Sequence, residues 1–241
     1  MHLGHVVCIV QARMGSQRLP GKILIELDKY EVYQWVYHRL KSSRLINKIV
    51  FATTTNSLDD EFVVKLKNES INYYRGDEQD VLSRYYTVAS LEKADTIVRV
   101  TCDCPLIDST LIDKGLLVHK ENSMHYTSNV IPPTFPDGFD FEIFSFEILE
   151  SAHKKAKESQ EREHVTTWII KKTENRKNSI QSQENYGNFR VTLDTPEDLV
   201  LLRKLICDGK ITKSTSYEEI LAFLISRPDL TNINKHWNVR S

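Results

Sequence analysis

Hydrophobic residues along the chain fall into short continuous runs that alternate with helical stripes. Residues 6–10 are all apolar, a pattern typical of a strand buried on both faces of a parallel sheet. Further strand-like runs occupy residues 48–53 and 95–101, and segments 33–40 and 59–69 carry apolar residues at helical spacing. This alternation predicts an α/β fold with a Rossmann-like, mostly parallel sheet flanked by helices.

The second half of the chain is less regular. Residues 139–143 alternate between apolar and acidic, which predicts a strand with Asp140 and Glu142 on one face. Residues 171–187 are polar and poorly periodic, so we expect a mobile excursion or an oligomer arm there. Residues 188–193 predict a strand with which the sheet resumes.

The loop after the first apolar run is rich in glycine and in positive charge. Within ten residues it holds the three cations Arg13, Arg18 and Lys22, together with Gly15 and Ser16. Glycines let backbone N–H groups approach an anion, and the cations neutralise its charge, so we expect a polyphosphate site. The spacing is neither that of a Walker A loop nor that of a Rossmann fingerprint. The alternative is an ordinary strand-to-helix turn with solvated charges.

Residues 11–22, Gln-Ala-Arg-Met-Gly-Ser-Gln-Arg-Leu-Pro-Gly-Lys, resemble a loop of the cytidylyltransferases. The similarity is to the spore-coat polysaccharide type and, more distantly, to the 3-deoxy-manno-octulosonate (CMP-sugar-acid) enzymes. It implies a GT-A-like nucleotidyltransferase fold and a loop that wraps CTP. We assign catalysis to Arg13 and Lys22, with a solvated stem expected for Lys22. The nucleotide contacts implied by this loop are Gln11, Ala12, Arg13, Gly15, Ser16, Arg18 and Lys22.

Two further segments are assigned to the nucleotide. Thr53 stands where the second strand runs into a loop. Residues 75–86 resemble the second nucleotide-contacting segment of the family, with Gly76 and Asp80 for the nucleoside and Arg84 for phosphate or substrate. On local grounds alone, the same residues read as the start of a helix.

An Asp that follows a buried strand is well placed to hold a metal over the crevice where ligands bind. Asp103 occupies such a position, and its alternative role is that of a turn or capping residue. The family pattern around it implies a metal ligand. Cys102 stands where the family usually has Gly, so it is expected to lie against the nucleotide and leaves the choice of nucleotide open.

Asp194 precedes a helix start formed by Thr195, Pro196 and Asp198. Capping explains these three residues and leaves Asp194 without a local role. The resemblance makes Asp194 the second metal carboxylate, and two carboxylates with substrate oxygens suit Mg²⁺.

Three residues besides Arg84 are assigned to the second substrate. Asp140 and Glu142 lie in a region that lines the acceptor pocket in the family, and the alternative is a solvated acidic strand face. His164 is a candidate for substrate contact, although a lone His is more often a surface or packing residue.

Length and charge limit the remaining possibilities. We expect one domain over residues 1–241, with an insertion at about 124–188 for acceptor binding and dimer contacts. The 32 basic and 33 acidic residues argue against a nucleic-acid or membrane-surface binder. No leader or long apolar run is found, so we expect a cytoplasmic protein. We also expect a homodimer.

The resulting hypothesis is a cytidylyltransferase that joins CMP from CTP to a hydroxylated acidic sugar or a similar small acceptor and releases pyrophosphate. Surface polysaccharide or glycan biosynthesis is the setting that the resemblance implies. The alternatives are a metal-dependent glycosyltransferase using a nucleotide sugar and a non-catalytic nucleotide-binding protein of the same fold.

Overall fold

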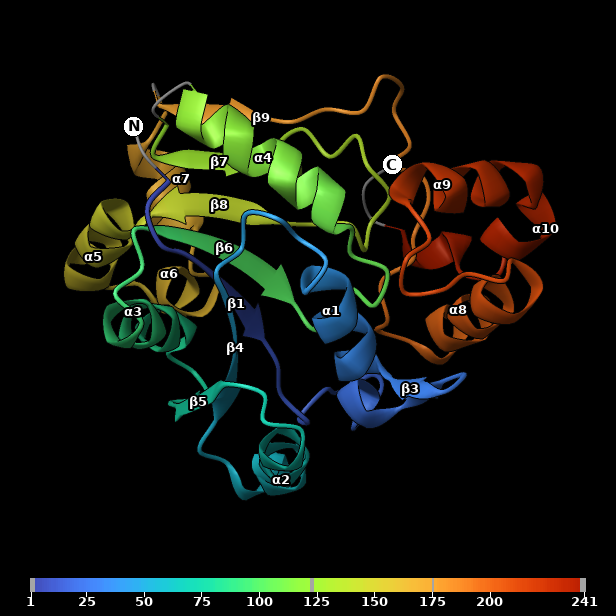
Figure 1. Cartoon of the computed structure of the whole chain (residues 1–241), viewed down its shortest axis with the longest axis horizontal. Coiled ribbons are helices and arrows are strands. Elements are labelled where there is room, and N and C mark those ends of the chain that lie inside the picture. Colours follow the sequence, from blue (N-terminus) through green and yellow to red (C-terminus); the bar gives the residue numbers. More distant parts are fainter. Residues whose placement is uncertain (1–2, 122–123, 175, 239–241) are drawn as a thin grey trace.

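The computed structural model describes residues 3–121, 124–174 and 176–238, and a seven-stranded sheet runs through its centre (Figure 1). The order of the strands is β5-β4-β1-β6-β8-β7-β9. Strands β5, β4, β1 and β6 are parallel to one another, whereas β8 is antiparallel to both β6 and β7. The sheet strands are β1 (Val6–Gln11), β4 (Lys48–Thr54), β5 (Tyr73–Gly76), β6 (Thr96–Thr101), β7 (Tyr126–Ser128), β8 (Glu142–Ser145) and β9 (Lys177–Ser179).

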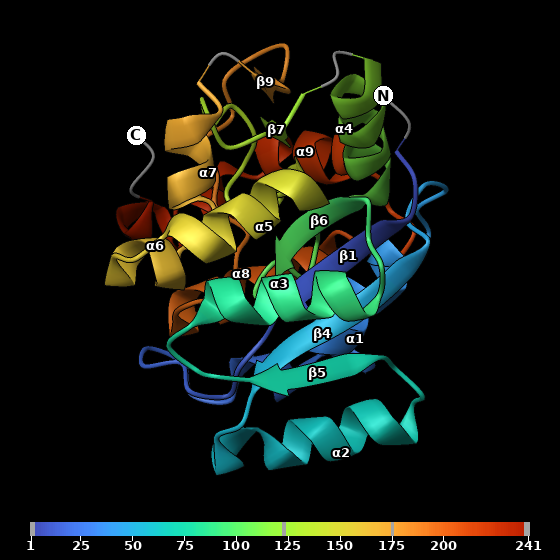
Figure 2. The same ribbon diagram turned by 90° about the vertical axis from the view of Figure 1, so that its left-hand side faces the viewer.

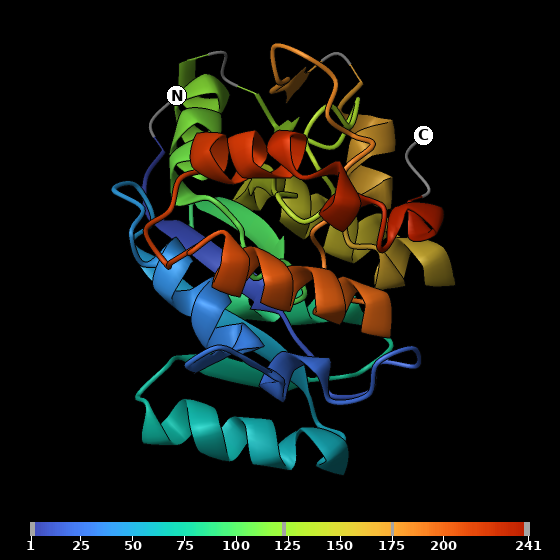
Figure 3. The same ribbon diagram turned by 90° about the vertical axis from the view of Figure 1, so that its right-hand side faces the viewer.

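Helices cover both faces of the sheet. One face is covered by α3, α5, α6 and α7, which lie together in Figure 2. The other face carries α1, α4, α8 and α9, with α1, α8 and α9 in front of the sheet in Figure 3. The helices are α1 (Val32–Leu40), α2 (Asp60–Asn68), α3 (Val81–Leu91), α4 (Ser109–Glu121), α5 (Phe146–Lys155), α6 (Ser159–Glu163), α7 (Thr167–Lys172), α8 (Pro196–Asp208), α9 (Tyr217–Ser226) and α10 (Pro228–Thr231). Smaller elements are the 3₁₀ helices η1 (Lys22–Leu24), η2 (Ser57–Asp59) and η3 (Lys235–Trp237) and the β2 (Glu26–Leu27) and β3 (Tyr30–Glu31) ribbon.

Strand β1 is buried on both faces, as its apolar run predicts. Val6, Cys8 and Val10 belong to one hydrophobic core, and Val7 and Ile9 belong to the other. Because β1 pairs with β4 on one side and with β6 on the other, the strand order reverses between β1 and β6. In open α/β sheets, ligands bind outside the carboxyl ends of the strands at such a point. None of the helices in the described parts of the chain is long and apolar enough to cross a membrane.

The α/β fold with its mostly parallel sheet is confirmed, but the strand predicted at residues 188–193 is wrong. This segment is irregular, and its backbone bonds to loops instead of to a sheet neighbour: Val191 N donates to Asp137 O at 2.6 Å and Leu193 N to Asp103 O at 2.8 Å. Its apolar alternation therefore comes from packing across the end of the sheet.

Two other strand predictions need correction. Of residues 139–143, only Glu142 and Ile143 are in β8, because the side chain of Asn129 takes the backbone bonds that a ladder would make, to Phe139 O and Phe141 N. The polar excursion at 171–187 contains β9, which pairs with β7. Region 124–188 thus adds three strands to the same sheet, while its assignment to dimer contacts stays a prediction.

A buried charge network fixes the chain where it enters α8. The carboxylate of Asp198, which has no exposed surface, accepts from Arg190 Nε and Nη2 at 3.0 Å each and from Asn234 Nδ2 at 2.8 Å. It also accepts from the backbone N of Asp194 at 2.9 Å and of Thr195 at 3.0 Å. These hydrogen bonds hold the Asp198 carboxylate ionised, so its pKa lies below the ordinary value although burial opposes the charge.

Removal of Arg190 is expected to destabilise the fold strongly. Arg190→Met leaves the Asp198 carboxylate buried without its cation, a defect that typically costs about 3–5 kcal/mol. Urea unfolding measures the loss. Arg203→Met on the exposed face of α8 is the matched control, expected within about 0.5 kcal/mol of the wild type. An equal effect of the two changes would contradict the structural role of Arg190.

Candidate functional site

A cavity of about 490 Å³ opens at the carboxyl ends of β1 and β6. It brings together residues from the loop after β1, the loop after β6 and the segment before α8. Most of the residues that the sequence assigned to the nucleotide and the metal line this cavity. The lining residues are Gln11, Ala12, Arg13, Ser16, Gln17, Arg18, Lys22, Ile23, Thr101, Cys102, Asp103, Glu163 and Asp194.

Lys22 lines the cavity and joins the two aspartates. Its Nζ donates to Asp103 Oδ2 at 2.7 Å and to Asp194 Oδ1 at 2.6 Å. The expected solvated stem is wrong, since Lys22 is only 9% exposed. Burial disfavours the ammonium charge, but the two carboxylates outweigh it and raise the pKa of Lys22.

Asp103 is ionised for the same reason. Burial opposes its charge, yet the attraction and the hydrogen bond of Lys22 hold the pKa of this carboxyl below its ordinary value. About a quarter of the Asp103 and Asp194 side chains remains exposed, so both carboxylates can be reached from the cavity.

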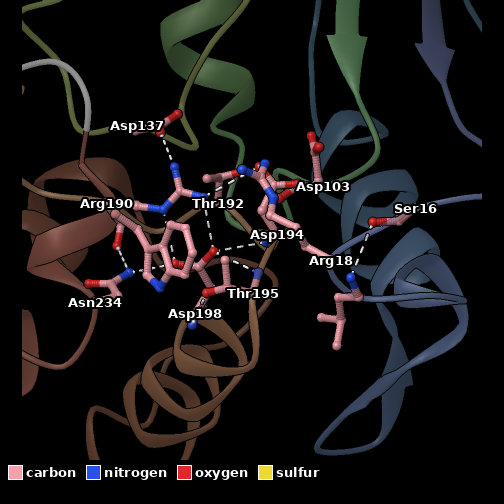
Figure 4. Close-up of polar contacts among 12 residues, drawn as sticks. Ser16, Arg18, Asp103, Asp137, Arg190, Thr192, Asp194, Thr195, Asp198 and Asn234 are labelled. Atoms are coloured by element: carbon pink, nitrogen blue, oxygen red, sulfur yellow. Dashed lines mark hydrogen bonds and ion pairs between the residues drawn. The ribbon is translucent and has the colours of Figure 1, made fainter.

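The irregular segment before α8 aims Asp194 at the cavity (Figure 4). Thr192 Oγ1 and Leu193 N both bond to the backbone O of Asp103, at 3.1 and 2.8 Å, so the two aspartates are tied together through the backbone. Asp194 Oδ2 accepts from Arg18 at 3.1 Å and from Arg190 at 3.3 Å. Long-range contacts therefore replace the parallel strand that was expected to deliver this residue.

Asp59, which the sequence analysis did not single out, fixes the loop after β1. Its buried carboxylate accepts from Met14 N at 2.7 Å and from Thr53 Oγ1 at 2.8 Å. Thr53 thus faces Asp59, is fully buried, and is absent from the cavity lining. At the far end of the loop, Gly21 has φ of 70°, a left-handed conformation that favours glycine just before Lys22.

A second cavity of about 530 Å³ adjoins the first and shares Gln11, Arg13, Gln17 and Glu163 with it. Asp80 lines this second cavity, caps α3 through Ser83 N at 2.9 Å and pairs with Arg162. The helix start at Asp80 is confirmed, and its assignment to the nucleoside stays a prediction for a residue that lines this cavity.

The remaining candidates near α3 and α6 lie elsewhere. Gly76 is where the Arg84 side chain packs, since an added Cβ would stand 2.8 Å from Arg84 Cγ. Arg84 is 1% exposed, and its Nε and Nη1 have no hydrogen-bond partner among the described residues.

Gly15 lies in the loop after β1 but does not line the first cavity. His164 is exposed and lines neither the first nor the second cavity. Glu163, the residue before His164, lines both cavities, although the sequence pattern did not single it out.

Asp140 and Glu142 line a third cavity, of about 280 Å³, together with Arg99 and Thr101. Thr101 also lines the first cavity, so the third cavity adjoins the Lys22 cluster, which consists of Lys22, Asp103 and Asp194. Glu142 is 5% exposed, which makes the solvated-face alternative wrong for this residue.

The donor set at Lys22 suits a hard cation that is shared with a ligand. Asp103 and Asp194 reach one ammonium, so their bonding oxygens are no farther apart than the sum of their two distances to Nζ. In the described parts of the chain, no three Asp, Glu, His or Cys side chains form a metal cage. Mg²⁺ typically takes one or two carboxylates and completes its shell with water and substrate phosphates. The assignment of Asp103 and Asp194 to a metal stays a prediction.

Comparison with known proteins identifies the family. The cytidylyltransferase family pattern matches residues 7–227, and the chain therefore belongs to that family. An uncharacterised protein of Methanocaldococcus jannaschii is 35% identical over 240 residues, covering 98% of this chain and 96% of that one. The spore coat polysaccharide biosynthesis protein SpsF of Bacillus subtilis is 29% identical over 235 residues, covering 94% and 97%.

Solved structures agree with the fold. A cytidylyltransferase from Leptospira borgpetersenii has a TM-score of 0.89 at 31% identity and covers 94% of this chain and 96% of its own. A CMP:2-keto-3-deoxy-manno-octonic acid synthetase complexed with CTP has a TM-score of 0.66 at 14% identity, covering 86% and 100%, which shows a shared fold. The chain is thus an enzyme of the cytidylyltransferase family.

The Lys22 bridge is expected to contribute to stability. Lys22→Met removes the cation that lies between the two carboxylates, and the double variant Lys22→Met/Asp103→Asn also removes part of the repulsion between them. We expect a coupling energy of about 1–3 kcal/mol in the double-mutant cycle, measured by urea unfolding. Lys22→Met with Glu61→Gln, an exposed acid on α2, is the control pair and should be additive. Additivity in both cycles would show that the bridge contributes nothing measurable to the free energy of unfolding.

Proposed function

We propose that this enzyme transfers CMP from CTP to a hydroxyl-bearing small molecule and releases pyrophosphate. The observation that supports this most is the Lys22 ammonium held between Asp103 and Asp194 in a cavity that Arg13 and Arg18 also line. Three cations and two carboxylates at the carboxyl edge of a sheet can receive a triphosphate together with its metal ion. A site for a nucleoside diphosphate sugar would give less reason for three cations.

In the proposed reaction, the hydroxyl oxygen of the acceptor attacks the α-phosphorus of CTP. The bond from that phosphorus to the bridging oxygen of the β-phosphate breaks, pyrophosphate leaves with the bonding electrons, and the hydroxyl proton passes to solvent. Such a displacement depends on positioning and on neutralisation of charge.

Each cation of the loop has a role in this proposal. Lys22 and Arg13 bind the phosphates and stabilise the charge that builds on the leaving pyrophosphate. Arg13 is half-exposed and meets Glu78 at 3.4 Å, a surface pair weak enough for the guanidinium to turn to a phosphate. Arg18 and Ser16 border the same cavity and would contact the triphosphate from the loop.

The nucleoside is assigned to the second cavity and its border with the first. Gln11, Ala12 and Asp80 line this region, and Cys102 lines the first cavity. Cys102 is 2% exposed, and burial raises the pKa of its thiol, so it is a neutral packing surface. Its Cβ stands where glycine is usual in the family, which makes this position the one to vary when nucleotide choice is tested.

Asp103 and Asp194 would hold Mg²⁺, which supplies charge neutralisation at phosphate oxygens and lowers the pKa of a bound hydroxyl. Asp140 and Glu142 are assigned to the acceptor pocket. The acceptor implied by the sequence resemblance is a hydroxylated acidic sugar or a similar compound, in surface polysaccharide or glycan synthesis in the cytoplasm, and the active form is expected to be a homodimer.

CTP with Mg²⁺ is expected to stabilise the protein more than the other triphosphates do. At 100 times its dissociation constant a ligand contributes roughly 2.7 kcal/mol, or about 5–10 °C in melting temperature for a chain of this length. Differential scanning fluorimetry with CTP, UTP, ATP and GTP measures the shifts. Equal shifts from all four would retain a triphosphate site and remove the case for cytidine.

Arg13→Ala is expected to lower turnover without weakening the fold. The side chain is half-exposed, so its loss opens no core cavity, whereas removal of one electrostatic stabiliser typically costs about 100-fold in turnover. Pyrophosphate release from CTP and urea unfolding give the two readouts, with Arg203→Ala as the control. Unchanged turnover would remove Arg13 from the mechanism, and release of a nucleoside diphosphate from a nucleotide sugar, in place of pyrophosphate from CTP, would favour a glycosyltransferase.

A further inference from the structure

The Lys22 ammonium occupies the position that an ion shared by Asp103 and Asp194 would need. Its Nζ lies 2.7 Å from Asp103 Oδ2 and 2.6 Å from Asp194 Oδ1. Mg²⁺ binds carboxylate oxygens at about 2.1 Å. An ion on the same two oxygens would therefore lie beside the ammonium, at a separation where like charges repel strongly. Lys22 and a shared metal ion thus exclude one another at these oxygens.

The remaining carboxylate oxygens of the two aspartates are also bonded. Asp194 Oδ2 accepts from Arg18 at 3.1 Å and from Arg190 at 3.3 Å. Three of the four oxygens thus already meet a cation, and the fourth, Asp103 Oδ1, accepts from the Cys104 thiol at 3.7 Å. A divalent cation that enters by itself would bring its charge next to one ammonium and two guanidinium groups.

A triphosphate reverses this balance of charge. It carries several negative charges, so its complex with one divalent cation is still an anion. Its phosphate oxygens offer new acceptors to Lys22 and Arg18, which both line the first cavity. Once Lys22 donates to phosphate, the two aspartates lose the positive charge between them, and the metal ion of the complex can replace it.

Lys22 can change partners without a rearrangement of its loop. The backbone is fixed, because Gly21 N donates to Met14 O at 3.1 Å and Met14 N donates to Asp59 Oδ1 at 2.7 Å. The ammonium stands at the end of a flexible four-carbon stem and has three donors, of which the aspartates take two. A phosphate oxygen can accept from the third donor before the other two bonds are released.

We propose that Lys22 occupies the metal position in the free enzyme, so that Asp103 and Asp194 bind a divalent cation only together with the triphosphate, to whose phosphates Lys22 then donates. Metal ion and nucleotide bind as one unit, and each strengthens the binding of the other. The inference rests on the proposed CMP transfer and on the assignment of the two aspartates to the metal ion.

Binding of Mn²⁺ to the full chain tests this without reference to turnover. Mn²⁺ takes the same kinds of oxygen ligand as Mg²⁺ and is followed by electron paramagnetic resonance. The chain is titrated with Mn²⁺ in the absence of nucleotide, and the titration is repeated for Lys22→Met. Arg13→Met is the matched control, since Arg13 is another cation of the same cavity and pairs with Glu78 instead of the two aspartates.

The wild-type chain is expected to bind Mn²⁺ at least about tenfold more weakly than Lys22→Met, because the variant frees one oxygen of each aspartate from the ammonium. Arg13→Met should stay within about twofold of the wild type, since its charge is half-exposed and screened. Lys22→Met/Asp103→Asn should lose the gain in affinity. Equal affinities of the wild type and Lys22→Met would overturn the inference, and so would an equal gain in Arg13→Met, which would show a general effect of charge.

The wild-type chain provides a second test that does not depend on the folding of a variant. NMR of isotope-labelled lysine side chains follows the Lys22 ammonium. Mg²⁺ alone is expected to leave its signal in place, whereas Mg²⁺ with a CTP analogue that has a methylene group between the α- and β-phosphorus should shift it. A signal that Mg²⁺ alone shifts as far, or that the analogue does not shift, would overturn the inference.

Pyrophosphate release from CTP, measured on the same preparation with a panel of hydroxyl-bearing acceptors, reports the proposed function separately. Release by a wild-type chain that binds Mn²⁺ as tightly as Lys22→Met would overturn this inference and retain CMP transfer. Absence of release with every acceptor, together with absence of analogue binding, would instead overturn the proposed function.

Discussion

One ammonium group connects the three segments that form the site. Lys22 is 81 positions from Asp103 and 172 from Asp194, and its Nζ bonds to both. The rest of the edge supports this contact, because Asp59 anchors the loop that carries Lys22 and Arg190 anchors the segment that carries Asp194. Loss of the bridge would leave the Asp103 and Asp194 side chains facing one another without the positive charge of Lys22 between them.

Paired charges recur across the whole edge. Lys22, Arg99 and Arg190 each meet at least one carboxylate of this chain. A polyphosphate that enters the first cavity therefore has to compete with Asp103 and Asp194 for Lys22. Once Lys22 binds phosphate instead, another positive charge is needed to compensate the charge of the two carboxylates. Lys22 and Arg99 differ in their surroundings, since the cavity at Lys22 is also lined by Arg13 and Arg18, whereas Arg99 bonds to Glu142 and Gln11.

Local patterns predicted what depends on neighbours in the sequence. The buried strand at residues 6–10, the cations of the following loop and the Thr195 helix start all have short-range signals, and the structure confirms the elements. The family resemblance supplied the pairing of Asp103 with Asp194. Nothing in the spacing could show that Lys22 is buried between them, that Thr53 faces Asp59, or that Glu142 pairs with Arg99, because such contacts join residues whose separation depends on the assembled sheet. Asp194 reached its place without the expected strand, through backbone bonds to the loop after β6.

The central claim is that the Lys22 cluster is the centre for CMP transfer, and a crystal structure with Mg²⁺ and a non-hydrolysable CTP analogue tests it most directly. The account predicts the triphosphate in the first cavity, with Lys22 Nζ on a phosphate oxygen and both Asp103 and Asp194 on the metal ion, directly or through its water. A triphosphate bound elsewhere, or bound while Lys22 still bridges the two carboxylates, would contradict it.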